Sequence, residues 1–393
     1  MPGPLEGIRV FDLTMWMVGP WASMQLGGMG ADIIHIEQPT ADWSSLGAGV
    51  PPTINGTSIG YIAWNMNKRG LFLDLKSPED RLTALEVLKT CDAFIINMRT
   101  GVAERLGLGY EAVAAVNPGI VYCSITGWGE SGPMMHRPGA DGQAQYFTGF
   151  WSTSGARGGQ REVYRHFTQI DASTGNYAAQ AILMGLLARK RTGRGQRIEV
   201  SMLRAAAALQ TPRIAEYLAT DEVAQPLGNA AFATAPDQAF FCQDQLWIGV
   251  SVTSEGEWRA FCAAIERPDL LDDPRFARNV DRVTHRDELA AILEPVFRAR
   301  QQYDWMMRLN RAGVPCGYPM RFDQLRYHPQ VTQNDYIVNV ETSGWGRVYT
   351  GGPPWHFSKT PGRWTGTPTP GEHTYEILDD VKRRTAVPAE TRG

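Results

Sequence analysis

The first part of the chain alternates short apolar runs, which have the length of β-strands, with longer segments of helical character. A strand-like run at Ile8–Leu13 is followed by a segment that Gly19-Pro20 opens as a helix, and a second strand-like run lies at Ile33–Ile36. Two parallel strands need a crossover connection, which is usually a helix. Further strand-like runs follow at residues 71–75, 93–96 and 120–125. The pattern predicts an α/β fold with an open, doubly wound, Rossmann-like sheet that binds ligands at the carboxyl ends of its strands.

The length of the chain and a change in its character predict two domains. A chain of 393 residues is longer than one hydrophobic core usually covers. From residue 224 the sequence changes to short strands mixed with helices, and its last part is rich in Gly, Pro, Thr and Trp. We expect a large α/β domain over residues 1–223, a smaller α+β domain over 224–328, and a C-terminal segment, 329–393, that returns to the large domain.

The charge balance excludes partners that need a strong overall field. The chain has 38 Lys and Arg against 41 Asp and Glu, a net charge of −3, so neither nucleic acid nor a membrane surface is an expected partner. A ligand that carries phosphate therefore needs a local cluster of cations. The sequence contains no run of about 18 apolar residues, and its start lacks the pattern of a signal peptide. We expect a cytoplasmic protein.

Common catalytic and cofactor motifs are missing. The five cysteines are scattered, without the spacing of a metal site or a redox pair. No Gly-x-Ser-x-Gly, Walker or His-Glu-x-x-His motif occurs. Glu37 ends the second predicted strand, where an acidic residue often binds ribose, but the glycines before it do not form Gly-x-Gly-x-x-Gly. We therefore expect neither a metal nor a nicotinamide cofactor.

Asp171 directly precedes the clearest predicted helix of the chain, Ala172–Arg191. An aspartate at such a position is commonly an N-cap, whose carboxylate accepts backbone N–H bonds and stabilises the helix by about 1 kcal/mol. Local sequence alone therefore favours a structural role for Asp171.

A series of short motifs in a fixed order changes that interpretation. They include Gly30-Ala31-Asp32-Ile33-Ile34-His35-Ile36-Glu37, Asn67-Lys68-Arg69-Gly70, Asn97-Met98-Arg99-Thr100-Gly101, Ser124-Ile125-Thr126-Gly127-Trp128-Gly129, Gln169-Ile170-Asp171-Ala172-Ser173-Thr174-Gly175 and Asp273-Pro274-Arg275-Phe276. From Leu5 to Glu376 the chain resembles the class III CoA-transferases, which include formyl-CoA and carnitine CoA-transferases and are related to α-methylacyl-CoA racemases. The resemblance implies a homodimer of interlocked rings.

The resemblance also implies a covalent mechanism on Asp171. Its carboxylate would attack the thioester of an acyl-CoA to give an aspartyl anhydride, and the CoA thiolate would then form an aspartyl-CoA thioester. A carboxylate is ionised at neutral pH and needs no general base, but it is a weak nucleophile that depends on positioning and on donors for the oxyanion. Backbone N–H groups near Val18 are candidates for those donors.

Residues matched to the family would bind coenzyme A, which is a substrate and product and not a cofactor. Met17 and Val18 would lie near the thiol, with Arg137 near the CoA chain. The remaining matched positions, mostly for the nucleotide part, are Gln38, Leu73, Lys76, Asn97, Met98, Arg99 and Arg105. The cations among these residues could form the local phosphate cluster.

Departures from the family pattern leave substrate and reaction open. Gln38 and Met17 replace an arginine and a glutamine of formyl-CoA transferases, and the family's glycine-rich loop is absent at residues 228–233. An acid bulkier or more apolar than formate or oxalate is therefore expected. The alternatives are a racemase, although Ala140 stands where racemases carry a histidine base, and a non-catalytic CoA-binding paralogue.

Overall fold

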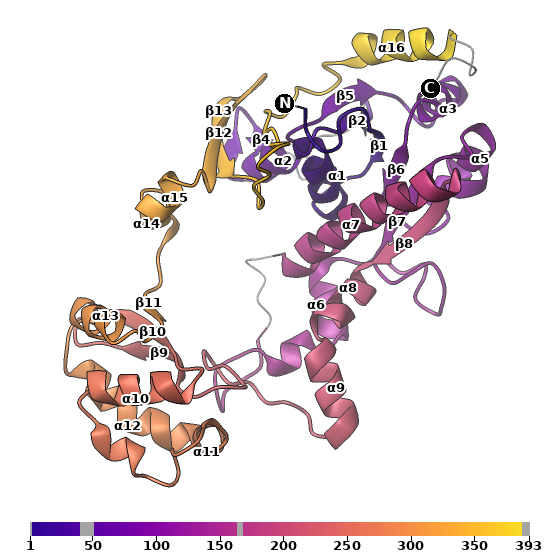
Figure 1. Ribbon diagram of the computed structural model, residues 1–393. Coiled ribbons are helices and arrows are strands. Elements are labelled where there is room, and N and C mark those ends of the chain that lie inside the picture. The colour runs from indigo at the N-terminus through magenta and orange to yellow at the C-terminus, as the bar shows by residue number, and fades with distance from the viewer. Residues whose placement is uncertain (1, 40–50, 163–167, 387–393) are drawn as a thin grey trace. The chain divides into compact units, whose positions relative to one another are not determined.

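The computed structural model describes residues 2–39, 51–162 and 168–386, which form two compact units (Figure 1). The large unit consists of Met1–Phe150, Arg165–Thr220 and Pro329–Gly393, and the small unit of Trp151–Tyr164 and Asp221–His328. Residues 151–162 were expected in the first domain. They belong to the small unit because the Gly228 N–H donates to the Gly155 carbonyl (3.2 Å) and Arg157 pairs with Asp287.

The large unit is built on a six-stranded sheet in the order β5-β2-β1-β6-β7-β8, and every neighbouring pair is parallel. Its strands are β1 (Arg9–Leu13), β2 (Asp32–Glu37), β5 (Arg69–Phe72), β6 (Ala93–Ile96), β7 (Val121–Thr126) and β8 (Gln196–Ser201). The chain winds outward from β1 in one direction and from β6 in the other. The predicted doubly wound parallel sheet is confirmed, and its order reverses between β1 and β6.

Successive strand residues alternate between two hydrophobic cores, one on each face of the sheet. Val10 packs with the helices α1 (Val18–Gly28) and α7 (Gln169–Thr192), which lie side by side (Figure 1). Phe11 packs on the opposite face with α3 (Pro78–Leu88) and α5 (Tyr110–Val116). Because helices cover both faces of the sheet, the strands consist of nearly continuous apolar residues.

Other elements of the large unit connect or flank this framework. The sequence predicted the third strand at 71–75, but β5 ends at Phe72 because the chain turns at Asp74, whose carbonyl accepts from the Ser77 N–H (2.8 Å). The remaining elements are α2 (Ile59–Trp64), α4 (Val102–Arg105), α6 (Asp141–Phe147), α8 (Met202–Leu209), α9 (Thr211–Thr220), α15 (Pro329–Thr332), the short pair β3 (Thr53–Ile54) and β4 (Thr57–Ser58), and the hairpin β12 (Ile337–Thr342) and β13 (Gly346–Gly351).

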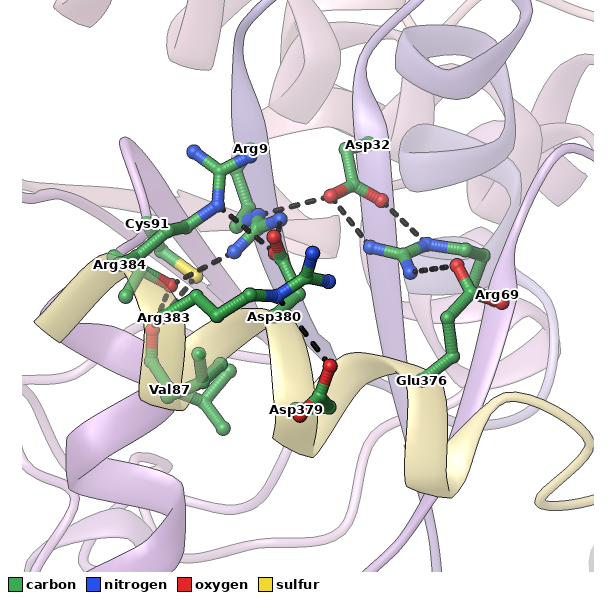
Figure 2. Close-up of polar contacts among 12 residues, drawn as sticks. Arg9, Asp32, Arg69, Val87, Cys91, Glu376, Asp379, Asp380, Arg383 and Arg384 are labelled. Carbon is green, nitrogen blue, oxygen red and sulfur yellow. Dashed lines mark hydrogen bonds and ion pairs between the residues drawn. The ribbon is translucent and has the colours of Figure 1, made fainter. Parts of the chain in front are cut away.

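The C-terminal helix α16 (Thr374–Ala386) closes the core beside α3. Ile377 is fully buried in that core, and polar side chains fasten the helix at the amino ends of β1, β2 and β5 (Figure 2). Arg9 pairs with Asp380 of the helix and with Asp32 of β2, and Arg69 Nη1 lies 2.9 Å from Glu376 Oε1. Buried apolar contacts, reinforced by these ion pairs, hold the C-terminal helix on the large unit.

The small unit has its own core beneath a three-stranded antiparallel sheet of order β11-β10-β9. Trp258 and Phe261 of α10 pack there with Phe297 and Trp305. The elements are β9 (Asp237–Phe241), β10 (Trp247–Ser251), α10 (Glu255–Ala264), α11 (Asn279–Thr284), α12 (Arg286–Arg298), α13 (Gln302–Arg311), β11 (Cys316–Gly317) and α14 (Phe322–Leu325). Ser254 and Glu257 form a reciprocal capping box that fixes the start of α10.

Candidate active site

The predicted ligand-binding residues follow the carboxyl ends of the parallel strands and so lie at one edge of the sheet. Met17 and Val18 follow β1, Gln38 follows β2, Leu73 follows β5, and Asn97 follows β6. The loops after β1 and β6 flank the point at which the strand order reverses, which is where open α/β sheets form their ligand crevice. The topology therefore brings residues from four separate segments to a single edge.

Asp171 lies inside the first turn of α7 and not at its N-cap. The helix begins at Gln169 with Thr168 as N-cap, three residues before the predicted start, so the N-cap interpretation of Asp171 is wrong. Asp141 performs the capping instead: its Oδ2 accepts from the backbone N–H groups of Ile170 (2.8 Å) and Asp171 (3.1 Å). Asp141, and not Asp171, therefore accepts from the first backbone N–H groups of α7.

Contacts on either side of Asp171 bring its helical turn against the start of α1. Gly175 lies one turn further along the same helix face, and a Cβ at this position would be 2.6 Å from the Val18 carbonyl oxygen. The Thr168 hydroxyl donates to the Met17 sulfur. The helical turn that carries Asp171 is thus flanked by one contact to Met17 and one to Val18.

The N-terminus of α1 is a source of backbone donors at this place. The N-cap, Met17, makes no side-chain capping bond. The first N–H groups of any α-helix have no partner within the helix, and together they carry a partial positive charge. The start of α1 at Val18 is therefore suited to stabilising negative charge that develops beside Asp171.

A buried ion pair supports the end of β1 below this loop. Asp12 Oδ2 lies 2.9 Å from Lys68 Nζ and accepts from Ser23 Oγ of α1 (2.6 Å). His35 Nδ1 lies 3.1 Å from the same oxygen. Burial alone would raise the pKa of the Asp12 carboxyl, but the Lys68 ammonium, His35 and these hydrogen bonds hold that pKa well below its usual range.

The predicted phosphate-binding cations are all exposed, whereas two other predicted contacts are not. Lys76, Arg99, Arg105 and Arg137 reach solvent from loops and from α4. Leu73 is 4% exposed in the core on the α3 face, and Met98 packs against the same core. The Leu73 side chain is therefore unavailable to a ligand, whereas Met98 is half-buried and lies beside Arg99 in a small pocket.

Glu37 is occupied by the C-terminal segment and cannot bind a ribose. Its side chain is 4% exposed and accepts from the Tyr61 hydroxyl (3.1 Å) and from the Gly371 N–H (2.7 Å). The hypothesis of a dinucleotide site based on this residue is therefore wrong.

Within residues 2–39, 51–162 and 168–386, no group of three or more His, Cys, Asp and Glu side chains could hold a metal ion, and none of the helices has the length and apolar character of a membrane span. Cys91, Cys123, Cys242 and Cys262 are buried, and burial raises the pKa of the Cys123 thiol to about 12. These four thiols are therefore unreactive core residues.

Two features of the site had no signal in the sequence. No pattern in the sequence near Asp141 indicates that it caps a helix that begins 28 residues later. Trp16, in the loop between β1 and α1, has a left-handed backbone with φ of +64°. An aromatic residue gives no local indication of that conformation, which glycine and asparagine usually adopt.

Comparisons with known proteins agree with this geometry. The model of CoA-transferase family III matches residues 5–374. Succinyl-CoA:glutarate CoA-transferase of Mus musculus is 33% identical over 97% of this chain and 87% of its own length, and formyl-CoA:oxalate CoA-transferase of Streptomyces coelicolor is 30% identical over 95% and 94%. The crystal structure of a CAIB/BAIF family protein from Brucella suis matches with a TM-score of 0.84 at 28% identity, covering 97% of this chain and 100% of that one. The chain therefore belongs to CoA-transferase family III and is an enzyme of that class.

Proposed function

We propose that this enzyme moves coenzyme A from an acyl-CoA to a carboxylic acid through covalent intermediates on Asp171. The main support for this proposal is the position of Asp171 in the first turn of α7, which packs against the start of α1. The capping carboxylate of this helix belongs to Asp141. The first turn of a helix lies at the positive end of the helix dipole, which favours negative charge.

The reaction consists of four acyl transfers that balance without net proton transfer. The Asp171 carboxylate attacks the thioester carbonyl, the C–S bond breaks, and CoA leaves as the thiolate. The thiolate attacks the aspartyl carbonyl of the anhydride and releases the donor acid as its carboxylate. The acceptor carboxylate then attacks the aspartyl-CoA thioester and expels the thiolate again. Finally the thiolate attacks the acceptor's carbonyl, which forms the new acyl-CoA and restores Asp171.

The chain's own groups would lower the barrier by position and charge. Backbone N–H groups at the start of α1, near Val18, would donate to the oxyanion formed in each step. The exposed cations at the carboxyl edge of the sheet would bind the CoA phosphates, and they are Lys76, Arg99, Arg105 and Arg137. Coenzyme A takes part as substrate and product, so the proposed reaction needs no cofactor.

The residues around the reacting carbonyl favour an acid that is more apolar than oxalate. Four consecutive apolar side chains, Met15 to Val18, form the end of the β1–α1 loop and the first residue of α1, and Gln38 supplies no charge for a second carboxylate. Similar enzymes are named for glutarate and oxalate. A screen of acyl-CoAs against monocarboxylic and dicarboxylic acids, read by mass spectrometry, identifies the pair used.

The racemase alternative lacks a second acid or base. Racemisation needs two such groups on opposite faces of the α-carbon. Ala140, which is the N-cap of α6, stands where racemases carry their histidine, and its methyl group cannot move a proton. With a chiral 2-methylacyl-CoA in deuterated water and no acceptor acid, we expect no label at the α-carbon. Label incorporated at the turnover rate would favour the racemase.

Asp171→Asn separates the chemistry from the fold. An amide is nearly isosteric with the carboxylate but cannot form the anhydride. The rate of transfer should therefore fall by far more than tenfold, which is the loss that a rise of about 1.4 kcal/mol in the activation free energy would cause. Thermal stability and CoA affinity should remain close to those of the wild type, because the proposed phosphate ligands lie elsewhere. Hydroxylamine added to wild type with acyl-CoA should modify Asp171 alone in peptide mapping. An active Asn variant, or an adduct on another residue, would refute the mechanism and favour a different use of the CoA site.

We further propose an interlocked homodimer in the cytoplasm. The helix α9 contains no buried residue and exposes Ile214, Tyr217 and Leu218 on one face. Leu183 and Leu187 of α7 are exposed as well. Apolar side chains at helical spacing on two helices of the large unit are typical of surfaces that a second subunit covers.

A further inference from the structure

The loop between β1 and α1, residues 14–17, is held by a side chain from a neighbouring strand. The Met15 N–H donates to Asn97 Oδ1 (2.9 Å), and Asn97 Nδ2 donates to the Met15 carbonyl (2.7 Å). The carboxamide thus bonds both polar groups of one backbone residue, as a strand partner would. Asn97 is therefore not only a residue of the ligand edge, because both ends of its amide engage the protein.

The position of this contact explains its effect. β1 and β6 are paired in parallel up to Leu13 and Ile96, and Asn97 is the next residue. Its side chain continues the hydrogen bonding beyond the last backbone pair, at the point where the strand order reverses. Asn97 therefore closes the base of the predicted ligand crevice between the two halves of the sheet.

The loop that Asn97 holds contains a strained residue. Trp16 has a φ of +64°, and its side chain is 57% exposed. A left-handed backbone is unfavourable for a bulky side chain, and it persists only where surrounding contacts impose it. Burial of the indole does not impose it here. The contacts that do are those of Asn97 to Met15 on one side and of Thr168 to Met17 on the other.

We infer that Asn97 is a positioning residue for the transfer reaction. By fixing Met15 it holds Trp16 in the left-handed turn, and this turn directs the backbone of Met17 and Val18 toward Asp171. The inference rests on the proposed function, because it assumes that Asp171 forms the covalent intermediates. It differs from the family-based expectation that the Asn97 side chain binds coenzyme A.

The test compares two asparagines of the same unit. Asn97→Leu removes both bonds to Met15. The matched control is Asn117→Leu, because Asn117 also donates from Nδ2 to backbone carbonyls, those of Leu88 (2.9 Å) and Cys91 (2.7 Å), but lies before β7 at the opposite edge of the sheet. For each full-length variant we would measure kcat and KM, CoA affinity by calorimetry, the melting temperature, and hydrogen exchange of the Met15 amide.

The expected pattern is specific to positioning. Asn97→Leu should lower kcat and the rate of Asp171 adduct formation by about a hundredfold, as a misplaced catalytic geometry does, with CoA affinity changed less than about threefold. Exchange at Met15 should become faster. Asn117→Leu should lower the melting temperature without changing kcat of the folded enzyme. Adding Trp16→Gly to Asn97→Leu should restore part of kcat, because glycine adopts the turn without an external constraint.

Other outcomes separate the possible errors. A large loss of CoA affinity with unchanged kcat would overturn the inference in favour of direct CoA binding. Equal effects of the two substitutions on melting temperature, with normal kcat, would reduce Asn97 to a structural role. If the wild type transfers CoA to no acid, the proposed function fails. Independently of that result, unchanged hydrogen exchange at the Met15 amide in Asn97→Leu would refute the claim that the Asn97 side chain holds Met15.

Discussion

At the scale of single residues, the ion pair of Asp12 and Lys68 is isolated from solvent on both sides. Breaking a buried pair leaves a charge without compensation, so Lys68→Met should lower the free energy of unfolding by about 3–5 kcal/mol at neutral pH. The exposed Lys89, which pairs with Glu86 on α3, offers a matched control. Lys89→Met should lower the free energy of unfolding by less than about 1 kcal/mol. Urea unfolding of both variants checks the difference.

The pH dependence of the Lys68 effect follows from the lowered pKa of Asp12. In the wild type, the folded carboxyl has a pKa below its unfolded value, so it contributes stability above the unfolded pKa of about 4 that is lost as pH falls through the folded value. In Lys68→Met the same buried carboxyl keeps His35 but loses the Lys68 ammonium, which is the main charge that offsets its burial, so its pKa rises and protonation favours the folded state. The difference in the free energy of unfolding between wild type and Lys68→Met should therefore become smaller as pH falls from 7 to 4. A constant difference would contradict this account.

At the scale of secondary-structure elements, the packing of α7 on α1 decides where Asp171 lies. A Cβ at Gly175 would be 2.6 Å from the Val18 carbonyl oxygen and 2.8 Å from Trp21 Cδ1. We expect Gly175→Ala to separate the first turns of the two helices and to lower kcat by about a hundredfold, because small displacements at the reacting atoms are costly. Steady-state kinetics and the rate of adduct formation measure this loss.

Gly185 of the same helix provides the control for this prediction. A Cβ there would also meet an atom at 2.6 Å, but this atom is Val121 Cγ1 of β7 in the sheet core. Gly185→Ala should lower stability by about 1–3 kcal/mol through overpacking while leaving kcat of the folded enzyme unchanged. If both substitutions reduced kcat equally, the effect would belong to the helix as a whole and not to its contact with α1.

At the scale of the whole molecule, the proposed dimer predicts a particle of twice the chain mass of 43.5 kDa. Leu218 on α9 is 73% exposed in the single chain, and we expect a second subunit to bury it. Leu218→Glu should therefore weaken the dimer, since an unpaired charge in an apolar interface is strongly unfavourable. Light scattering at micromolar concentration gives the mass of each variant.

A second exposed leucine tests whether this effect is specific. Leu82 on α3 is 65% exposed but belongs to the opposite face of the sheet from α7. Leu82→Glu should leave the mass unchanged. A wild-type particle of single-chain mass would reject the dimer, and dissociation by both substitutions would show that any added charge disrupts the assembly.

The sequence by itself determined the architecture of the large unit and the edge on which the site lies. Alternating apolar runs and helices are local patterns, and they predicted the parallel sheet whose strand ends carry Met17, Gln38, Leu73 and Asn97. The motifs around Asp171 indicated the family that the comparisons confirmed. These features are readable because periodicity and short motifs depend on neighbouring residues in the chain.

Only the tertiary structure decided which groups hold the site in place. Local sequence favoured Asp171 as a helix cap, whereas the family motifs indicated a nucleophile and matched Asn97 to coenzyme A binding. In the fold, Asp141 caps α7 from another helix, and Asn97 bonds to Met15, which is 82 residues away in sequence. Such partners depend on which strands and helices become neighbours. The physical reason is that a carboxylate or a carboxamide can satisfy many different donors and acceptors, so its chemistry alone does not specify its partner.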